Sequence, residues 1–195
     1  MTPSRHLTVP AAAIALVAAV VTGCDRPASV EGKAPVVAPA SGPAAFTYEE
    51  PDDISGYYLP ASDAEAGGYV LDHVFLGQPA EFEAWQAGTR SATFAPVMLE
   101  FQNAATTQRI GMEADGPGRG IRVLPTRYSL DGGRVHFEGT ARPIGRVVFD
   151  GRLDKDALAS AKRNLGGAET PVVVGRLKVG GEVVENVRLA WFGGD

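Results

Sequence analysis

The chain has 195 residues, of which 45% are hydrophobic and 21% are charged, as is ordinary for a globular protein. Acidic residues outnumber Lys and Arg by 23 to 18, so the net charge of −5 excludes overall attraction to nucleic acid or to an anionic membrane surface. The 24 glycines and 14 prolines favour turns and short strands over long helices.

Residues 1–23 have the three parts of an export signal. Arg5 supplies a positive charge, residues 11–21 form an uninterrupted apolar run, and the small residues Thr22 and Gly23 follow. The apolar run is much shorter than the ~20 residues that span a bilayer. We therefore expect a signal peptide that is cleaved, and no permanent transmembrane helix.

The run Val21, Thr22, Gly23 and Cys24 resembles the lipobox of bacterial lipoprotein precursors: an aliphatic residue, a small residue, Gly or Ala, then Cys. The resemblance implies lipid attachment to the Cys24 sulfur, cleavage between Gly23 and Cys24, and acylation of the new N-terminus. A thiolate is the nucleophile that such chemistry needs. Cys24 is also the only cysteine, so its lipidation leaves no free thiol outside the cytoplasm. The alternative is an ordinary signal peptide that contains a cysteine.

Lipidation would place the protein on a bacterial cell membrane or outer membrane, with its domain facing the periplasm. Two or three acyl chains, such as palmitate, would hold it there, because one chain alone anchors only marginally. Asp25 directly follows the cysteine and resembles an inner-membrane retention signal. Cleavage would leave 17 basic and 23 acidic residues, a charge of −6.

Residues 24–46 are predicted to form the lipid anchor and a flexible tether. Pro27, Pro35, Pro39 and Pro43 alternate with Ala, Val and Ser, which favours an extended polyproline-like path. At ~3.1 Å per residue this tether would reach at most about 70 Å. Residues 47–195 are predicted to form a single β-rich domain.

Within that domain, the residue patterns at 69–76 and 95–101 predict β-strands. Residues 119–130 are predicted to form a strand that is broken or bulged at Pro125. The segment 79–87 reads as a short helix, with Pro79 at its first position and Phe82 and Trp85 on one face. Asp154 is predicted to cap a second helix that ends near Gly166.

Three segments share the pattern Gly, Arg, apolar, any, apolar, any, Gly: GRVHFEG from 133, GRVVFDG from 145 and GRLKVGG from 175. We interpret them as three strands with apolar residues on one face and arginine on the other. A C-terminal hairpin turns at residues 180–181, and Val183 and Trp191 are expected to point into the core. The predicted fold is mainly β, an antiparallel sandwich or barrel-like sheet of about seven or eight strands with two short helices.

Candidate contact residues for a ligand or partner are His73, Tyr57, Tyr58 and Trp191. Core packing is the simpler interpretation of the three aromatic residues, and a ligand pocket is the alternative. His73 follows Asp72, but neighbours on a strand point to opposite faces, so the two are not expected to pair. His73 is instead expected to share a face with Leu71 and Phe75 and to be partly buried.

His136 is expected on a polar, solvated strand face. The sequence has no G-x-S-x-G elbow, no H-x-x-x-H spacing, and no Lys-Ser/Thr after its GPGRG run at 116–120. We therefore predict no catalytic residue, no metal and no cofactor.

The main hypothesis is a lipid-anchored cell-envelope protein whose domain binds an envelope protein or the cell wall without catalysis. The first alternative is a carrier of a small apolar ligand, which requires a closed cavity lined with aromatic residues. The second is a small envelope hydrolase, which requires His73 or His136 within hydrogen-bond reach of a carboxylate in a cleft. A filled core with an exposed apolar patch would favour the main hypothesis.

Overall fold

The computed structural model describes residues 45–105, 120–164 and 170–193, all of them in one compact unit. The signal peptide, the lipobox, most of the tether, residues 116–119 of the GPGRG run and Gly166 therefore lie outside the described residues. No helix within the described ranges has the length and hydropathy needed to cross a membrane. The described elements are β1 (Phe46–Glu49), β2 (Gly56–Pro60), β3 (Glu65–Ala66), β4 (Tyr69–Leu76), α1 (Pro79–Gln86), β5 (Val97–Asn103), β6 (Ile121–Val123), β7 (Pro125–Asp131), β8 (Arg134–Ala141), β9 (Gly145–Leu153), α3 (Lys155–Arg163), β10 (Pro171–Val179) and β11 (Glu182–Phe192).

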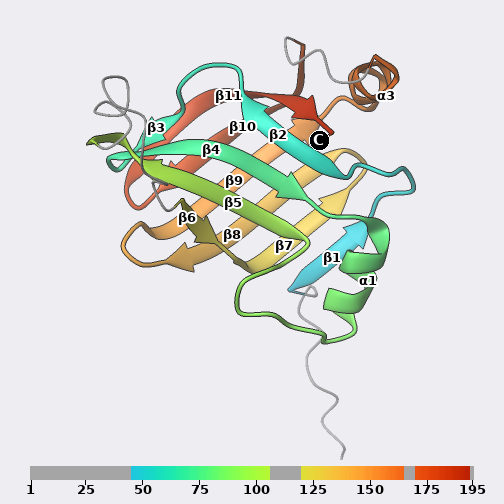
Figure 1. The fold of residues 1–195 in the computed structure, drawn as a ribbon, viewed down its shortest axis with the longest axis horizontal. Helices are drawn as coiled ribbons and strands as arrows, with labels where there is room; N and C mark the ends of the chain where they lie inside the picture. The colour runs from blue at the N-terminus through green and yellow to red at the C-terminus, as the bar shows by residue number, and fades with distance from the viewer. Residues whose placement is uncertain (1–44, 106–119, 165–169, 194–195) are drawn as a thin grey trace, which may run out of the picture. The chain divides into compact units, whose positions relative to one another are not determined.

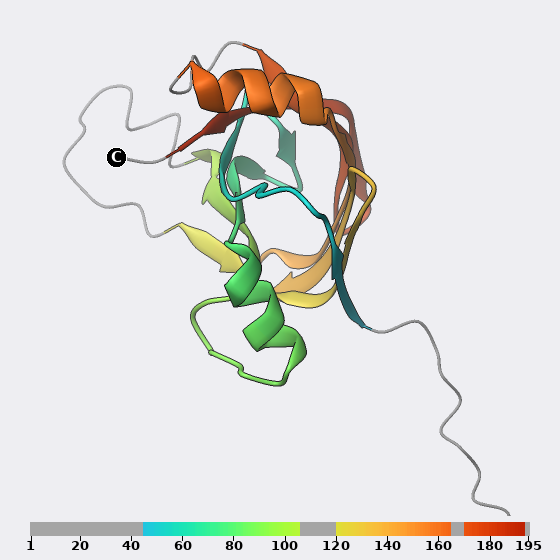
Figure 2. The ribbon, with the colours of Figure 1, turned by 90° about the vertical axis from the view of Figure 1, so that its right-hand side faces the viewer.

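These strands form a single curled sheet, so the mainly β prediction is confirmed (Figure 1; Figure 2). The order is β1-β7-β8-β9-β10-β11-β2-β4-β5-β6, with β3 added beside β4. All pairs are antiparallel except β1 with β7. The sheet has 11 strands, more than the predicted seven or eight. The prediction contained no strand at β1, β2 or β3, and residues 119–130, predicted as one strand broken or bulged at Pro125, form the two strands β6 and β7.

The three repeated segments form strands as predicted, β8, β9 and β10, and the structure places these strands side by side. Phe137 of β8 lies opposite Phe149 of β9, which lies opposite Leu177 of β10, and all three side chains are fully buried. The arginines that precede each apolar pair lie on the exposed face. The turn between β7 and β8 uses Gly132 and Gly133, both at positive φ, which is the geometry of a tight two-residue hairpin.

Two glycines at paired positions make room for the core on β9 and β10. Gly151 lies opposite Gly175, and the Phe149 ring packs onto both. A Cβ atom added at Gly175 would lie 2.6 Å from the Asp150 carbonyl oxygen and 2.8 Å from Phe149 Cζ. Glycine inside a strand often marks a bend or a close backbone approach, and here it lets the sheet curl around a large ring.

Both helices form as their sequences predict. Pro79 occupies the first turn of α1, and the Glu81 carboxylate accepts a hydrogen bond from the Gln78 backbone N–H at 2.7 Å. Phe82 and Trp85 of this helix are buried. In α3, the Asp154 side chain accepts a hydrogen bond from the Ala157 N–H at 2.9 Å, which confirms it as the cap.

A buried carboxylate, paired with a partly exposed lysine, ties the first described strand to the rest of the fold. Glu50 follows β1 and is only 7% exposed. Its Oε1 accepts a hydrogen bond from the Gly133 N–H at 2.5 Å, and its Oε2 contacts Lys155 Nζ at the start of α3. The hydrogen bond to Glu50 raises the pKa of Lys155, so the ammonium stays charged at neutral pH. One carboxylate thus joins the end of β1, the β7–β8 turn and α3.

The C-terminal strand departs from simple alternation. Asn186 adopts φ 57°, and the pairing of β10 with β11 shifts register there, as at a bulge. Val183 consequently stays 38% exposed, whereas Val187 and Leu189 are buried, so the inward position predicted for Val183 is wrong. Trp191 is partly buried against the core, and its Nε1 donates a hydrogen bond to the Ser55 carbonyl at 2.9 Å.

We predict that Gly175→Ala lowers the free energy of unfolding by about 1–3 kcal/mol, the usual cost of overpacking a filled core. The added methyl group would collide with the Asp150 backbone and the Phe149 ring. Gly181→Ala is the control, because a Cβ atom at Gly181 meets nothing within 4 Å. Urea unfolding of both variants measures the difference, and equal stabilities would contradict this account of the core.

Candidate functional site

A bulge in β4 decides where the predicted site residues point. Leu71 pairs with Phe101 and His73 pairs with Glu100, so the β4–β5 register shifts between Leu71 and His73. Leu71 and Val74 are both buried, although simple alternation would place them on opposite faces. His73 consequently does not share the inner face with Leu71, and that part of the prediction is wrong.

The same bulge brings Asp72 and His73 together. Asp72 Oδ2 lies 2.7 Å from His73 Nδ1, so the prediction that these neighbours do not pair is also wrong. Gln102 Nε2 donates a hydrogen bond to Asp72 Oδ1 at 2.6 Å. When His73 is neutral and donates from Nδ1, its Nε2 is an acceptor, which is the arrangement a general base uses.

Tyr57, His73, Phe75 and Phe94 form a continuous cluster on the outer face of β2 and β4 and the loop before β5; we call it the aromatic patch. The Tyr57 ring lies 5.1 Å from the His73 ring and 5.3 Å from the Phe75 ring, measured between centroids. Phe75 in turn lies 5.8 Å from Phe94. Tyr57 is 38% exposed, and the side chain of His73 is 18% exposed.

The other two predicted contact residues lie elsewhere. Tyr58 points into the core and is 1% exposed, and its hydroxyl donates a hydrogen bond to the Ile54 carbonyl at 2.6 Å. Its burial raises its pKa well above the ordinary value. Tyr58 is therefore a core residue. Trp191 lies at the end of β11, in a pocket that Tyr57 also lines.

This Trp191 pocket has a volume of about 370 Å³ and mixes aromatic with charged groups. Lys162 Nζ from α3 lies 5.5 Å from the centroid of the Trp191 ring and donates a hydrogen bond to the Asp53 carbonyl at 2.6 Å. Burial raises the pKa of the Asp53 carboxyl, but hydrogen bonds from Ser55 and the charge of Lys162 outweigh it and lower the pKa overall. The lining residues are Asp53, Ser55, Gly56, Tyr57, Phe75, Leu76, Gly77, Gln78, Glu81, Lys162, Trp191 and Gly193.

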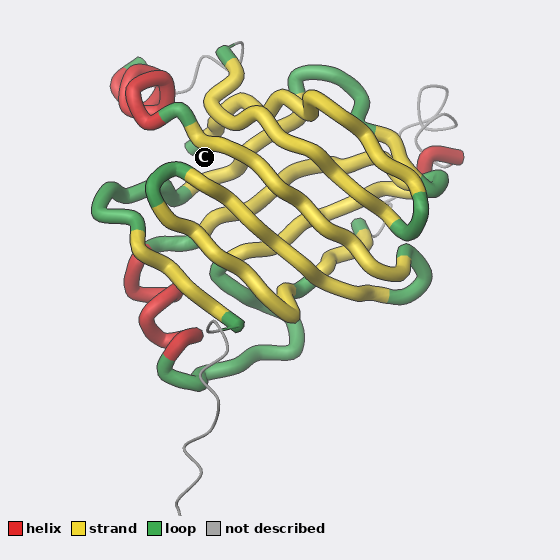
Figure 3. The backbone as a smooth tube through the Cα atoms, turned by 180° about the vertical axis from the view of Figure 1, so that it is seen from behind, coloured by secondary structure: helices red, strands yellow, loops and turns green. Residues whose placement is uncertain are grey.

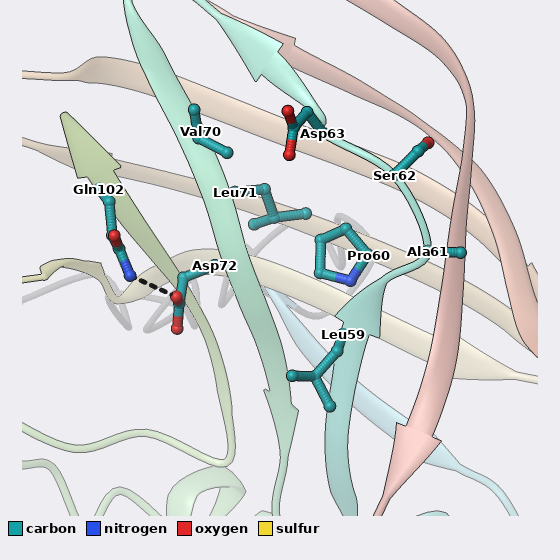
Figure 4. Close-up of a pocket in the computed structure, with 9 residues that line it drawn as sticks. All are labelled: Leu59, Pro60, Ala61, Ser62, Asp63, Val70, Leu71, Asp72 and Gln102. Atoms are coloured by element: carbon teal, nitrogen blue, oxygen red, sulfur yellow. Dashed lines mark hydrogen bonds between the residues drawn. The ribbon is translucent and has the colours of Figure 1, made fainter. Parts of the chain in front are cut away.

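A second open pocket of about 370 Å³, the Asp72 pocket, lies further along β2 and β4 (Figure 4). Asp72 and Gln102 lie on one side of it, joined by their hydrogen bond. Ser62 lies across the pocket on the far side of Pro60, and its hydroxyl points away from Asp72. Leu59, Pro60, Ala61, Ser62, Asp63, Val70, Leu71, Asp72 and Gln102 line this pocket.

His136 lies between two carboxylates on the outer face of β8 and β9. Its Nδ1 is 2.6 Å from Asp150 Oδ1, and its Nε2 is 3.3 Å from Glu138 Oε1. Its side chain is 24% exposed, so it is paired and not simply solvated as predicted. A hydrogen bond from Arg146 lowers the pKa of Glu138, which keeps this carboxylate ionised. No group of three or more His, Asp, Glu or Cys side chains in the described ranges is placed to hold a metal ion.

The sequence pointed to Tyr57 and His73, which the fold brings together, but missed Asp72, Phe75, Phe94 and Gln102. Alternation along β2 and β4 could have placed Phe75 beside Tyr57. The pairing of Asp72 with His73 depends on the bulge, for which the sequence carries no signal. Comparison of the chain with protein-family models, with curated proteins and with solved structures gave no match. Function is therefore argued from the geometry of the site alone.

Proposed function

We propose that this chain is a lipid-anchored protein of the bacterial cell envelope whose β-rich domain binds another envelope protein through the aromatic patch. The lipobox-like run ending at Cys24 supports the anchor. The single observation that carries the binding role is the cluster of four rings between two open pockets, with Tyr57 38% exposed and Phe75 and Phe94 partly buried against the core.

The filled interior favours this role over carriage of a small apolar ligand. Phe101, Phe137 and Phe149 point inward and are fully buried, and Phe149 packs directly on the backbone of Gly151 and Gly175. A carrier needs open space where these rings lie. The described core thus stabilises the fold and leaves recognition to the outer surface.

The aromatic patch suits a protein partner because its side chains are large, rigid and part apolar. Outward positions of an antiparallel sheet are normally polar, so neighbouring aromatic rings there are unusual. Tyr and Phe are enriched at protein interfaces, where they fill pockets at a low entropy cost. Phe192 of β11 lies opposite Tyr57, which extends the aromatic surface across a third strand.

A tether from the membrane would let this surface search for its partner. The Pro-rich segment would allow the domain to move up to about 70 Å from the bilayer. Asp25 favours the inner membrane as the site of attachment. The partner would then be a protein in the periplasm or in either membrane.

We predict that Cys24→Ala leaves the precursor uncleaved and without lipid, because attachment needs the Cys24 sulfur and cleavage follows it. Metabolic labelling with a fatty acid, combined with a gel shift, measures both steps in intact cells. Ser91→Ala, a change remote from Cys24 in the chain, is the processing control. Equal fatty-acid label in wild type and Cys24→Ala would refute the lipoprotein assignment.

We predict that a photo-reactive side chain at position 57 forms one discrete adduct with a partner protein in intact cells. The matched control is position 183, because Tyr57 and Val183 are both 38% exposed strand residues. Phe75→Ser should weaken the adduct formed from position 57, since the two rings pack together. An adduct released by a muramidase would identify the cell wall as the partner, and equal adducts at 57 and 183 would contradict the patch.

The contact between Asp72 and His73 favours a hydrolase as the second candidate function. His73 would act as general base, oriented by Asp72, on a substrate in the adjacent pocket. A hydrolase would cleave p-nitrophenyl acetate above the buffer rate, and His73→Gln would abolish this while His136→Gln would retain it. Wild-type protein that leaves the ester intact, or equal loss in both variants, would count against this candidate.

A further inference from the structure

The outward positions of β7–β11 carry a concentration of positively charged side chains. Figure 3 shows the backbone of these strands from behind. We call this surface the arginine face. Six exposed arginines and Lys178 lie on it, against four carboxylates, those of Asp131, Glu138, Asp150 and Glu185. Seven cations and four anions leave a charge of +3 with His136 neutral. The charge expected for the mature chain is −6, so the distribution of charge is strongly uneven.

Three arginines form one row across this face. Arg134 lies directly opposite Arg152, and Arg152 and Arg188 flank Val174 on the strand between them. Like charges directly opposite each other destabilise a sheet. None of the three makes a hydrogen bond or ion pair with another side chain in the part of the chain that the structure describes. The row therefore opposes folding slightly and remains open to an external anion.

Of the four acids on the arginine face, only Asp131 adjoins the row: it lies opposite Arg134 on the neighbouring strand, and no ion pair joins the two among the described residues. Glu138 is bound by Arg146 at 2.8 Å, and Glu185 is bound by Arg176 at 2.8 Å. Asp150 is occupied by His136. The internal pairs therefore leave the three-arginine row exposed, with the 45% exposed Val174 between two of its members.

The start of the domain lies at the edge of the same face. Phe46 of β1 pairs with Tyr128 of β7, and the Tyr128 N–H donates a hydrogen bond to the Ala45 carbonyl at 3.0 Å. The tether thus joins the domain next to the arginine face. The aromatic patch belongs to the other half of the curled sheet, on β2 and β4.

We infer that the arginine face docks on the anionic phospholipid headgroups of the membrane that carries the anchor, an inference that rests on the proposed lipid attachment. Guanidinium groups form paired hydrogen bonds with phosphate oxygens, and an exposed valine beside them can contact the glycerol region. Basic residues near an anionic bilayer are attracted within about a Debye length of its surface. Docking would turn the aromatic patch away from the membrane and toward the periplasm.

The test uses the expected mature chain, residues 24–195 with Cys24→Ala, so that neither an acyl chain nor the apolar signal peptide contributes. Sedimentation compares its binding to vesicles of phosphatidylglycerol mixed with phosphatidylcholine and to vesicles of phosphatidylcholine alone. We expect stronger binding to the anionic vesicles, reversed by high salt, and at least about tenfold weaker binding for Arg134→Gln with Arg152→Gln. Arg134→Lys with Arg152→Lys should retain most of the binding.

The matched control is Arg122→Gln with Arg163→Gln, which removes the same charge from β6 and α3 and should bind like the parent chain. Equal binding to both kinds of vesicle would overturn the inference. So would a folded Arg134→Gln, Arg152→Gln variant that binds like the parent, or an equal loss in the control. Because every chain in the test lacks lipid, its outcome is separate from the fatty-acid labelling that tests the anchor.

Discussion

Packing large rings inside one curled sheet is the constraint on which the rest of the structure depends. Phe149 lies at the centre of β9 and needs space that only glycine leaves, at Gly151 beside it and at Gly175 on the next strand. Those two positions let the strands approach and bend, and the bend lets one sheet cover its own apolar face. The interior is then occupied, and chemistry or recognition must use the outer surface.

The outer surface divides along the curl of the sheet. The half formed by β7–β11 is basic and rich in arginine, whereas β2 and β4 carry aromatic rings with Asp72 and His73 between two pockets. Under the docking that we infer, the basic half of the sheet would face the membrane and the aromatic half would face the periplasm. The net charge conceals this division, because acidic residues outside the arginine face outweigh its cations.

Local rules predicted the regular parts of this fold and failed where the backbone departs from regularity. The three repeated segments, the start of α1 at Pro79 and the Asp154 cap of α3 have short-range causes, and the structure confirms them. The bulges near Asp72 and Asn186 shift the pairing register, and each changes the face on which the residues around it lie. At the candidate site, residue type was enough to predict Tyr57 and His73 as contact residues, but not the contact between Asp72 and His73. Tyr57 is exposed and Tyr58 is buried in the core. Residue type alone does not decide which of two neighbouring tyrosines faces the core.

The parallel pairing of β1 with β7 has a mechanical consequence for a domain held at its N-terminal end. A pulling force that runs along β1 loads its hydrogen bonds to β7 in shear, so that they share the load and do not open one at a time. Directly after β1, Glu50 accepts a hydrogen bond from Gly133 and forms an ion pair with Lys155. These two contacts hold the C-terminal end of β1 in place when the strand is pulled. If the chain is anchored through Cys24 as we propose, this arrangement reinforces the start of the domain against tension from the membrane side.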